Sequence, residues 1–171
     1  KREVLHWYGI PWNSKPVHTS AALPGCQAQT ERATALVLGA TAGFDRYFGL
    51  GVLGIDEVWC PAQLLLDLDT ARHAGRVAQG AVSAPELELE RLPEVVDEAV
   101  GGGIPFVAHA STAAAFRQQY EFPRVLQRLD RAQWAAKGRP EAYRAAEAQA
   151  RELISQHHYE PPPDLRREVR A

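Results

Sequence analysis

The sequence has 171 residues, of which 46% are hydrophobic and 23% are charged, and its formal net charge is −2 at pH 7. This composition is typical of a globular domain and excludes a polycation that binds duplex nucleic acid, and no apolar run reaches the roughly 18 residues that a membrane-spanning helix needs. The two cysteines, Cys26 and Cys60, lack metal-binding spacing and form no disulfide framework, so we expect a reduced, cytoplasmic protein.

The first residues have the pattern of the end of a helix. The segment 3–9 runs into Gly9, and glycine is the residue that most often stops a helix. The sequence contains no methionine, so residue 1 is not a translation start. We therefore expect that the chain is part of a longer protein.

Strand and helix candidates alternate along most of the chain. We expect short strands at 10–12, near Phe44 and at 104–108, and helices at 26–39, 61–80, 86–100, 111–120, 131–137 and 141–156. Pro61 suits the first position of its helix, while Ser111 and Asp130 suit the capping position of theirs.

This alternation predicts an α/β fold made of parallel βαβ units. A complete (β/α)8 barrel needs about 250 residues, and only about three strands are visible here. We therefore expect half of a (β/α)8 TIM-type barrel in residues 1–122, followed by a helical C-terminal extension in residues 123–171. A small three-layer sandwich is the structural alternative.

Several motifs, in order, resemble those of the corrinoid-dependent trimethylamine and glycine-betaine methyltransferase family. The family's P-D-x-Q-A-x-x-E junction is similar to 24–31, and its L-x-x-D-x-E helix is similar to 66–69. Asp45 stands where the family often has a Gly-Leu-Asp turn. The family signature F-L-x-H-x-H-T-x-x-x-F-R resembles 106–117, with Ser111 in place of the second histidine, and P-x-L-x-D-R-x-x-x-x-W resembles 123–134.

The resemblance implies an activity, a partner and a cofactor. Family members move a methyl group from a tertiary or quaternary amine to Co(I) of a separate corrinoid protein, so the cobalamin is expected on that partner and not on this chain. The family's trimethylamine enzymes carry pyrrolysine in the barrel, and this chain contains none. If the chain covers that position, it belongs with members without pyrrolysine, which resemble quaternary-amine demethylases. We expect the C-terminal half of such an enzyme, oligomeric and inactive by itself.

The expected catalytic face follows the second strand candidate. A quaternary ammonium has no N–H to donate, so aromatic faces and nearby acids hold it. Asp45, as a catalytic residue, and Tyr47 and Phe48, as substrate-binding residues, occur together where barrel enzymes place their active sites. The alternative is that both rings only fill the barrel.

His109 follows the last strand candidate and is the second expected catalytic residue. We expect it to approach the same cavity as Tyr47 and Phe48. A histidine in this place can instead serve only the structure, through hydrogen bonds.

The loop after the first strand offers a further binding site. His18 and Ser20 lie in this loop, and Gln27 and Glu31 lie four residues apart at the start of the next helix. A helix N-terminus attracts anions, so a betaine carboxylate is an expected ligand of this loop and helix start, with Glu31 also expected to support the loop. A solvated loop without a ligand is the alternative.

No metal site is expected. The adjacent His157 and His158 point about 100° apart on a helix, so they make poor joint ligands. A metal-dependent hydrolase barrel is disfavoured because no carboxylate–histidine cluster has ligand spacing. The alternative to a methyltransferase is a truncated, non-catalytic barrel that acts as a binding or interaction module.

Overall fold

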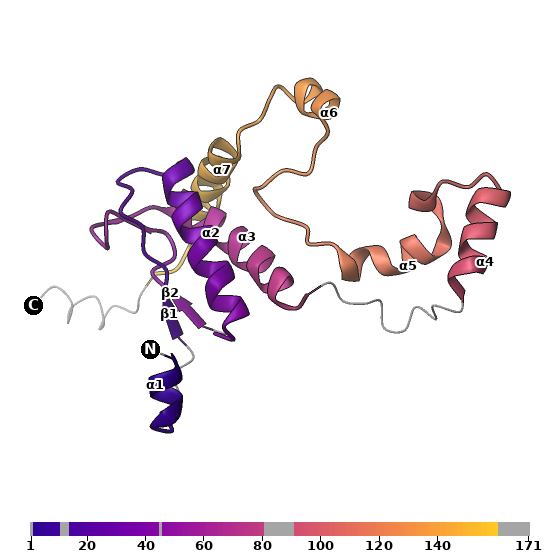
Figure 1. Ribbon diagram of the computed structural model, residues 1–171. Helices are drawn as coiled ribbons and strands as arrows, with labels where there is room; N and C mark the ends of the chain where they lie inside the picture. The colour runs from indigo at the N-terminus through magenta and orange to yellow at the C-terminus, as the bar shows by residue number, and fades with distance from the viewer. Residues whose placement is uncertain (1, 11–13, 45, 81–90, 161–171) are drawn as a thin grey trace, which may run out of the picture.

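The computed structural model describes residues 2–10, 14–44, 46–80 and 91–160. Figure 1 shows its helices and strands. In chain order these are α1 (Arg2–Trp7), β1 (Ser14–Pro16), α2 (Cys26–Thr41), β2 (Arg46–Phe48), β3 (Val52–Leu53), β4 (Val58–Trp59), α3 (Pro61–Ala78), α4 (Leu92–Val96), the π-helical turn η2 (Asp97–Gly101), the 3-10 turn η3 (Phe106–Ala108), α5 (Ala110–Gln119), α6 (Arg131–Ala136) and α7 (Ala142–Ser155).

The strands of the described part form two small sheets. β1 runs parallel to β2, with Ser14 opposite Arg46 and Pro16 opposite Phe48. β3 and β4 form an antiparallel hairpin. The predicted mixture of helices and strands is confirmed, whereas the half barrel and its boundary at 122/123 stay predictions. Residues 11–12 of the first strand candidate lie outside the described residues, and the first described strand is β1.

Helix α2 packs through one narrow face against α3 and against the residues at the ends of β1 and β2. Its buried residues are Ala28, Arg32, Leu36 and Gly39, which recur every three or four positions and therefore share one side of the helix. The helix continues past its predicted end at residue 39. It stops at Gly43, which has a φ of 77° and whose N–H donates to the Ala40 carbonyl, the arrangement that ends many helices.

Helix α3 is the central helix of the fold, because it contacts α2 on one side and α7 on the other (Figure 1). Cys60 has extended backbone and Pro61 begins the helix as predicted. Toward α2, Ala74 packs with Leu36 and Val17. Toward α7, Ala62 and Leu66 pack with Ala146 and Val125, and the small alanines let the two helices approach closely.

The segment that leads back to α7 is held by a buried carboxylate. The Asp69 carboxylate accepts the backbone N–H groups of Arg124, Val125 and Leu126 at 2.9, 2.7 and 3.0 Å, and it pairs with Arg72. Burial alone would raise the pKa of Asp69, but the three N–H donors and Arg72 together hold that pKa below its ordinary value of 3.8. The carboxylate therefore stays ionised, which ties the segment 124–126 to α3.

Residues 92–122 form a separate lobe, the α4–α5 lobe, which stands apart from α2, α3 and α7 (Figure 1). The strand predicted at 104–108 is wrong, because Phe106–Ala108 forms the 3-10 turn η3. Pro105 has no N–H to offer a sheet, and the Ala108 N–H instead donates locally to the Pro105 carbonyl at 2.8 Å. The Ala108 N–H is therefore bonded within its own turn and not to a neighbouring strand.

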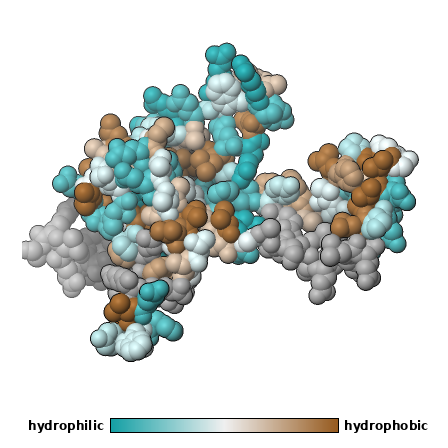
Figure 2. All heavy atoms as spheres, viewed as in Figure 1, coloured by the Kyte–Doolittle hydropathy of each residue, from teal (hydrophilic) through white to brown (hydrophobic). Residues whose placement is uncertain are grey.

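The α4–α5 lobe exposes a run of large apolar side chains. Figure 2 shows apolar residues gathered over this lobe. The residues at least two-fifths exposed are Leu92, Val96, Val100, Ile104, Phe106, Val107, Phe116, Tyr120 and Phe122. The buried apolar clusters of the described residues all lie in the α2–α3–α7 body, so the lobe has little apolar packing of its own. In the described ranges, no helix combines the length and the apolar character needed to cross a bilayer.

We predict that Asp69→Asn lowers the free energy of unfolding by about 2–3 kcal/mol at pH 7, because an amide replaces part of a charged acceptor of three N–H groups. A depressed carboxyl pKa stabilises the fold above the ordinary value of 3.8, and this stabilisation is lost as pH falls through the folded-state pKa. Urea denaturation at pH 7 and pH 3 should therefore show the gap between the two proteins narrowing in acid. Asp130→Asn is the control, since asparagine caps a helix as well as aspartate does.

We also predict that this chain self-associates through the α4–α5 lobe, because exposed apolar patches of this kind mark protein contacts. Light scattering after size exclusion should give a mass above 18.8 kDa. Phe106→Glu with Val107→Glu should return the mass to that of a monomer, whereas Leu38→Glu, a change at an exposed leucine of α2, should not. An unmodified chain that elutes as a monomer would contradict the prediction.

Candidate functional site

The C-terminal ends of β1 and β2 lie at one edge of the structure, because the two strands are parallel. Their exits are joined by a hydrogen bond from the Val17 N–H to the Phe48 carbonyl at 2.9 Å. The β3–β4 hairpin then folds back onto the loop after β1, where Gly54 and Ile55 donate to the Ala21 and Thr19 carbonyls at 2.9 Å each. Two loops far apart in sequence thus meet at the edge where α/β proteins bind ligands.

His18 contacts an aromatic ring and a carboxylate at this edge. Its Nδ1 lies 3.0 Å from Asp56 Oδ1, and its ring meets Phe48 edge-on with centroids 6.2 Å apart. Phe48 is 47% exposed, and the side chains of His18 and Asp56 are 39% and 55% exposed. The three side chains form an open cluster, the strand-end cluster, which solvent and small ligands can reach.

Asp56 is the member of the strand-end cluster that the sequence analysis missed. It lies in the turn between β3 and β4, where Ile55 and Asp56 have φ values of 53° and 75°. Left-handed backbone costs energy at any side chain other than glycine, particularly at a β-branched isoleucine, and such strain often occurs at functional sites. The sequence around Asp56 has Gly54 two residues earlier and lies between the apolar pairs 52–53 and 58–59. This pattern indicates a turn but does not indicate that Asp56 contacts His18.

Glu31 gathers the other predicted loop residues. Its carboxylate accepts the Thr19 hydroxyl at 2.6 Å, the Ser20 N–H at 3.0 Å and the Gln27 amide at 2.9 Å. These donors, with the Thr19 hydroxyl foremost and the Gln27 amide next, lower the pKa of Glu31 below its ordinary value of 4.5. Ser20, Gln27 and Glu31 are thus brought together in an arrangement that anchors the loop bearing His18, while their substrate-binding role stays a prediction.

Beneath the strand-end cluster lies a buried ion pair. Arg32 of α2 and Asp67 of α3 are both fully buried, with Nη1 of the arginine 2.9 Å from Oδ2 of the aspartate. Asp67 lies in the motif at 66–69 that resembles the family, but the motif does not indicate a partner for it. Arg32 had one usable signal, which is its place between Ala28 and Leu36 on the apolar face of α2.

Tyr47 lies on the opposite face of β2 from Phe48, because successive strand residues point to opposite sides. Its ring packs with Val17, Leu36 and Ala74, and its hydroxyl donates to the Phe44 carbonyl at 3.2 Å. This position matches the alternative in which the ring fills the fold. Asp45, the other predicted residue here, lies outside the described residues.

His109 caps helix α5 in the α4–α5 lobe. Its Nδ1 accepts the Ser111 N–H at 3.2 Å, so His109 takes the capping position that was predicted for Ser111. Its Nε2 lies 3.1 Å from Glu98 Oε2, and the residue is 7% exposed. Since α5 lies far from β2 in Figure 1, the structure does not bring His109 to Tyr47 and Phe48.

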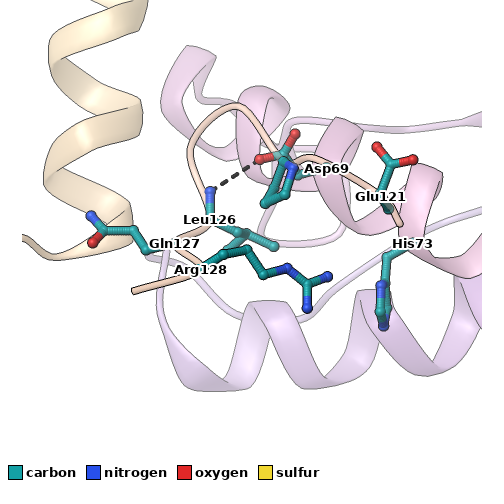
Figure 3. Close-up of a pocket in the computed structure, with 7 residues that line it drawn as sticks. Asp69, His73, Glu121, Leu126, Gln127 and Arg128 are labelled. Carbon is teal, nitrogen blue, oxygen red and sulfur yellow. Dashed lines mark hydrogen bonds between the residues drawn. The ribbon is translucent and has the colours of Figure 1, made fainter. Parts of the chain in front are cut away.

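A separate cavity of about 360 Å³ lies beside the C-terminal half of α3. Its lining residues are Asp69, His73, Glu121, Pro123, Leu126, Gln127 and Arg128. Figure 3 shows the Asp69 carboxylate turned toward the backbone nitrogen of Leu126, so its charge is already used by the fold. The predicted site residues do not line this cavity. Within the described ranges, no three His, Cys, Asp or Glu side chains are grouped as metal ligands.

Known proteins resemble the chain over nearly its whole length. The family described as trimethylamine methyltransferase (MTTB) matches residues 4–171. The trimethylamine methyltransferase MttB2 of Methanosarcina mazei is 26% identical over 163 residues, which are 93% of this chain and 31% of that protein. MttB of Methanosarcina barkeri is 27% identical, and MttB of Methanosarcina thermophila is 26% identical, with coverage of 31% and 32% of those proteins. The chain thus spans about a third of the length of these curated relatives, and by its match over residues 4–171 it belongs to the trimethylamine methyltransferase family.

Proposed function

We propose that the protein containing this chain transfers a methyl group from a methylated amine, of the tertiary or quaternary class, to a corrinoid protein. Family membership supports the methyltransferase class. The observation that carries the proposal is the strand-end cluster, in which His18 contacts both Phe48 and Asp56 where two parallel strands end. The predicted substrate-binding role of His18 and Phe48 is part of this proposal.

The chemistry of the cluster suits a methylated ammonium group. Such a cation is attracted to the face of an aromatic ring by about 0.5–2 kcal/mol, depending on how far it is desolvated. The Asp56 carboxylate adds a negative charge 3.0 Å from Nδ1 of His18, and this contact limits where the carboxylate can point. A quaternary ammonium has no N–H, so a ring and a carboxylate are sufficient to hold it, and the N–H of a protonated tertiary amine can donate to the same carboxylate.

Methyl transfer breaks a C–N bond, and the amine leaves with the electron pair of that bond. A corrinoid on a partner protein supplies the nucleophile that receives the methyl group. The residues of this chain therefore bind the amine and turn one methyl group outward, toward the partner. The half-exposed ring of Phe48 leaves the side of the cluster open to such a partner.

The rest of the active site is proposed to lie outside this chain. A barrel site draws on the ends of several strands, and the chain spans about a third of its relatives' length. We propose that residues 1–122 contribute half-barrel units and that residues 123–171 form a helical extension. We also propose that the chain alone does not catalyse methyl transfer. A catalytic role for His109 stays a hypothesis, which requires the α4–α5 lobe to meet the other strands.

We predict that Thr19→Val raises the pKa of Glu31 toward 4.5, because the Thr19 hydroxyl is the leading cause of its low value. A carboxyl-carbon NMR titration measures this midpoint directly. Anchoring of the loop is complete above pH 4.5 in the unmodified chain and is lost as pH falls through the folded-state pKa. Thr34→Val, which removes a hydroxyl bonded only to its own helix in α2, is the matched control and should leave the midpoint unchanged.

We predict that Phe48→Ala and Asp56→Asn each weaken tetramethylammonium binding by about 3- to 30-fold, in line with the loss of one cation–π or charge contact. Calorimetric titration of the full-length protein measures the affinity, and methyl transfer with the corrinoid partner should fall in parallel. Phe106→Ala is the control, since that ring is 53% exposed but lies in the α4–α5 lobe. Unchanged affinity in both strand-end variants would remove the cluster from the amine site.

A further inference from the structure

One nitrogen of Arg32 holds the backbone on both sides of the strand-end cluster. Its Nη1 donates to the Val17 carbonyl at 3.1 Å and to the Gly49 carbonyl at 2.9 Å. Val17 directly precedes His18, and Gly49 directly follows Phe48. The position of this guanidinium therefore sets the distance between the two backbone segments from which His18 and Phe48 project.

Asp67 holds Arg32 in place and binds a third point of the backbone. Its Oδ2 pairs with Arg32 and also accepts the Gly51 N–H at 2.7 Å, while its Oδ1 accepts the Gln63 amide at 2.7 Å. A Cβ at Gly51, where φ is 78°, would lie 2.9 Å from Leu64 Cβ, so only glycine lets the backbone come this close. The loop after β2 is thus drawn down onto the ion pair.

The buried ion pair loses much of its attraction to the free-energy cost of removing both charges from water. Burial lowers the pKa of Arg32 and raises that of Asp67, in each case as the largest effect, so both charges are disfavoured by their surroundings. Two further nitrogens of Arg32, Nε and Nη2, and Oε1 of Gln63 are buried without a hydrogen-bond partner among the described residues. Apolar residues of similar volume commonly replace such a pair with no loss of stability.

We propose that Arg32, supported by Asp67, is a positioning residue that sets the geometry of the amine site by holding the Val17 and Gly49 carbonyls on one guanidinium nitrogen. The proposal rests on the proposed function for its ligand, but its geometric part stands independently. This role explains why the fold keeps a buried ion pair whose burial costs free energy. The pair holds His18 and Phe48 in one arrangement, which apolar packing at the same place cannot do because it offers no donor to the two carbonyls.

The test is a double variant, Arg32→Met with Asp67→Leu, in the full-length protein. We expect the double variant to fold, since no charge is left unpaired, but with a lower melting temperature, because the Val17 and Gly49 carbonyls and the Gly51 N–H lose their buried partners. Hydrogen exchange should become faster at 17–21 and 49–57, while α2 and α3 stay protected. Affinity for tetramethylammonium should fall about tenfold, and Arg32→Lys should restore part of it because an ammonium can still donate to carbonyls.

The surface pair of α7 provides the matched control. Glu147→Gln with Arg151→Gln removes a second arginine–carboxylate contact of 2.9 Å, and it should change neither loop exchange nor affinity. Unchanged loop exchange in the buried double variant would overturn the proposal, as would its failure to fold, which would assign the pair to stability. If the unmodified protein does not bind tetramethylammonium, the proposed function fails, while faster exchange in the two loops would still support positioning by Arg32.

Discussion

The buried contact between Arg32 and Asp67 joins the parts of the structure on which the site depends. Arg32 comes from α2 and Asp67 from α3, and their hydrogen bonds with the backbone reach the segments just after β1 and β2. Helix packing alone leaves the strand exits free to shift, because apolar contacts have no preferred direction. A guanidinium has donors in fixed directions, so it can set where two carbonyls lie relative to each other.

This constraint explains why the accessible chemistry gathers at one edge. With the strand exits held, the loop after β1 accepts the backbone N–H groups of the β3–β4 hairpin, and the hairpin tip then presents Asp56 to His18. Glu31 secures the same loop from the other side through Thr19 and Ser20. The exposed ring and carboxylate are therefore supported by buried polar contacts, which is the order expected of a binding site built on a rigid base.

The body and the α4–α5 lobe differ in how they are held. The body buries its apolar residues between α2, α3 and α7, whereas the lobe depends on local hydrogen bonds such as the capping of α5 by His109. Where the chain returns from the lobe to the body, Asp69 fixes the segment 124–126 on α3. The family signature that contains His109 thus lies in a lobe with exposed apolar side chains, away from the strand-end cluster.

Local pattern was sufficient for most of the described helices and for placing Gln27 and Glu31 on one helix face. The proline at 61, the period of α7 and the cap at Asp130 are signals that act within a few residues, and Gln27 and Glu31 share a face by helix geometry alone. The strand at 104–108 failed because an apolar run becomes a strand only beside another strand. The local patterns around Asp56 and Arg32 indicated a turn and an apolar helix face but not their partners, which are 38 and 35 residues away. The sequence by itself thus determined the family, most of the described helices and the shared helix face of Gln27 and Glu31. Only the tertiary structure decided which side chains meet across the fold, because those contacts join segments that no local periodicity relates.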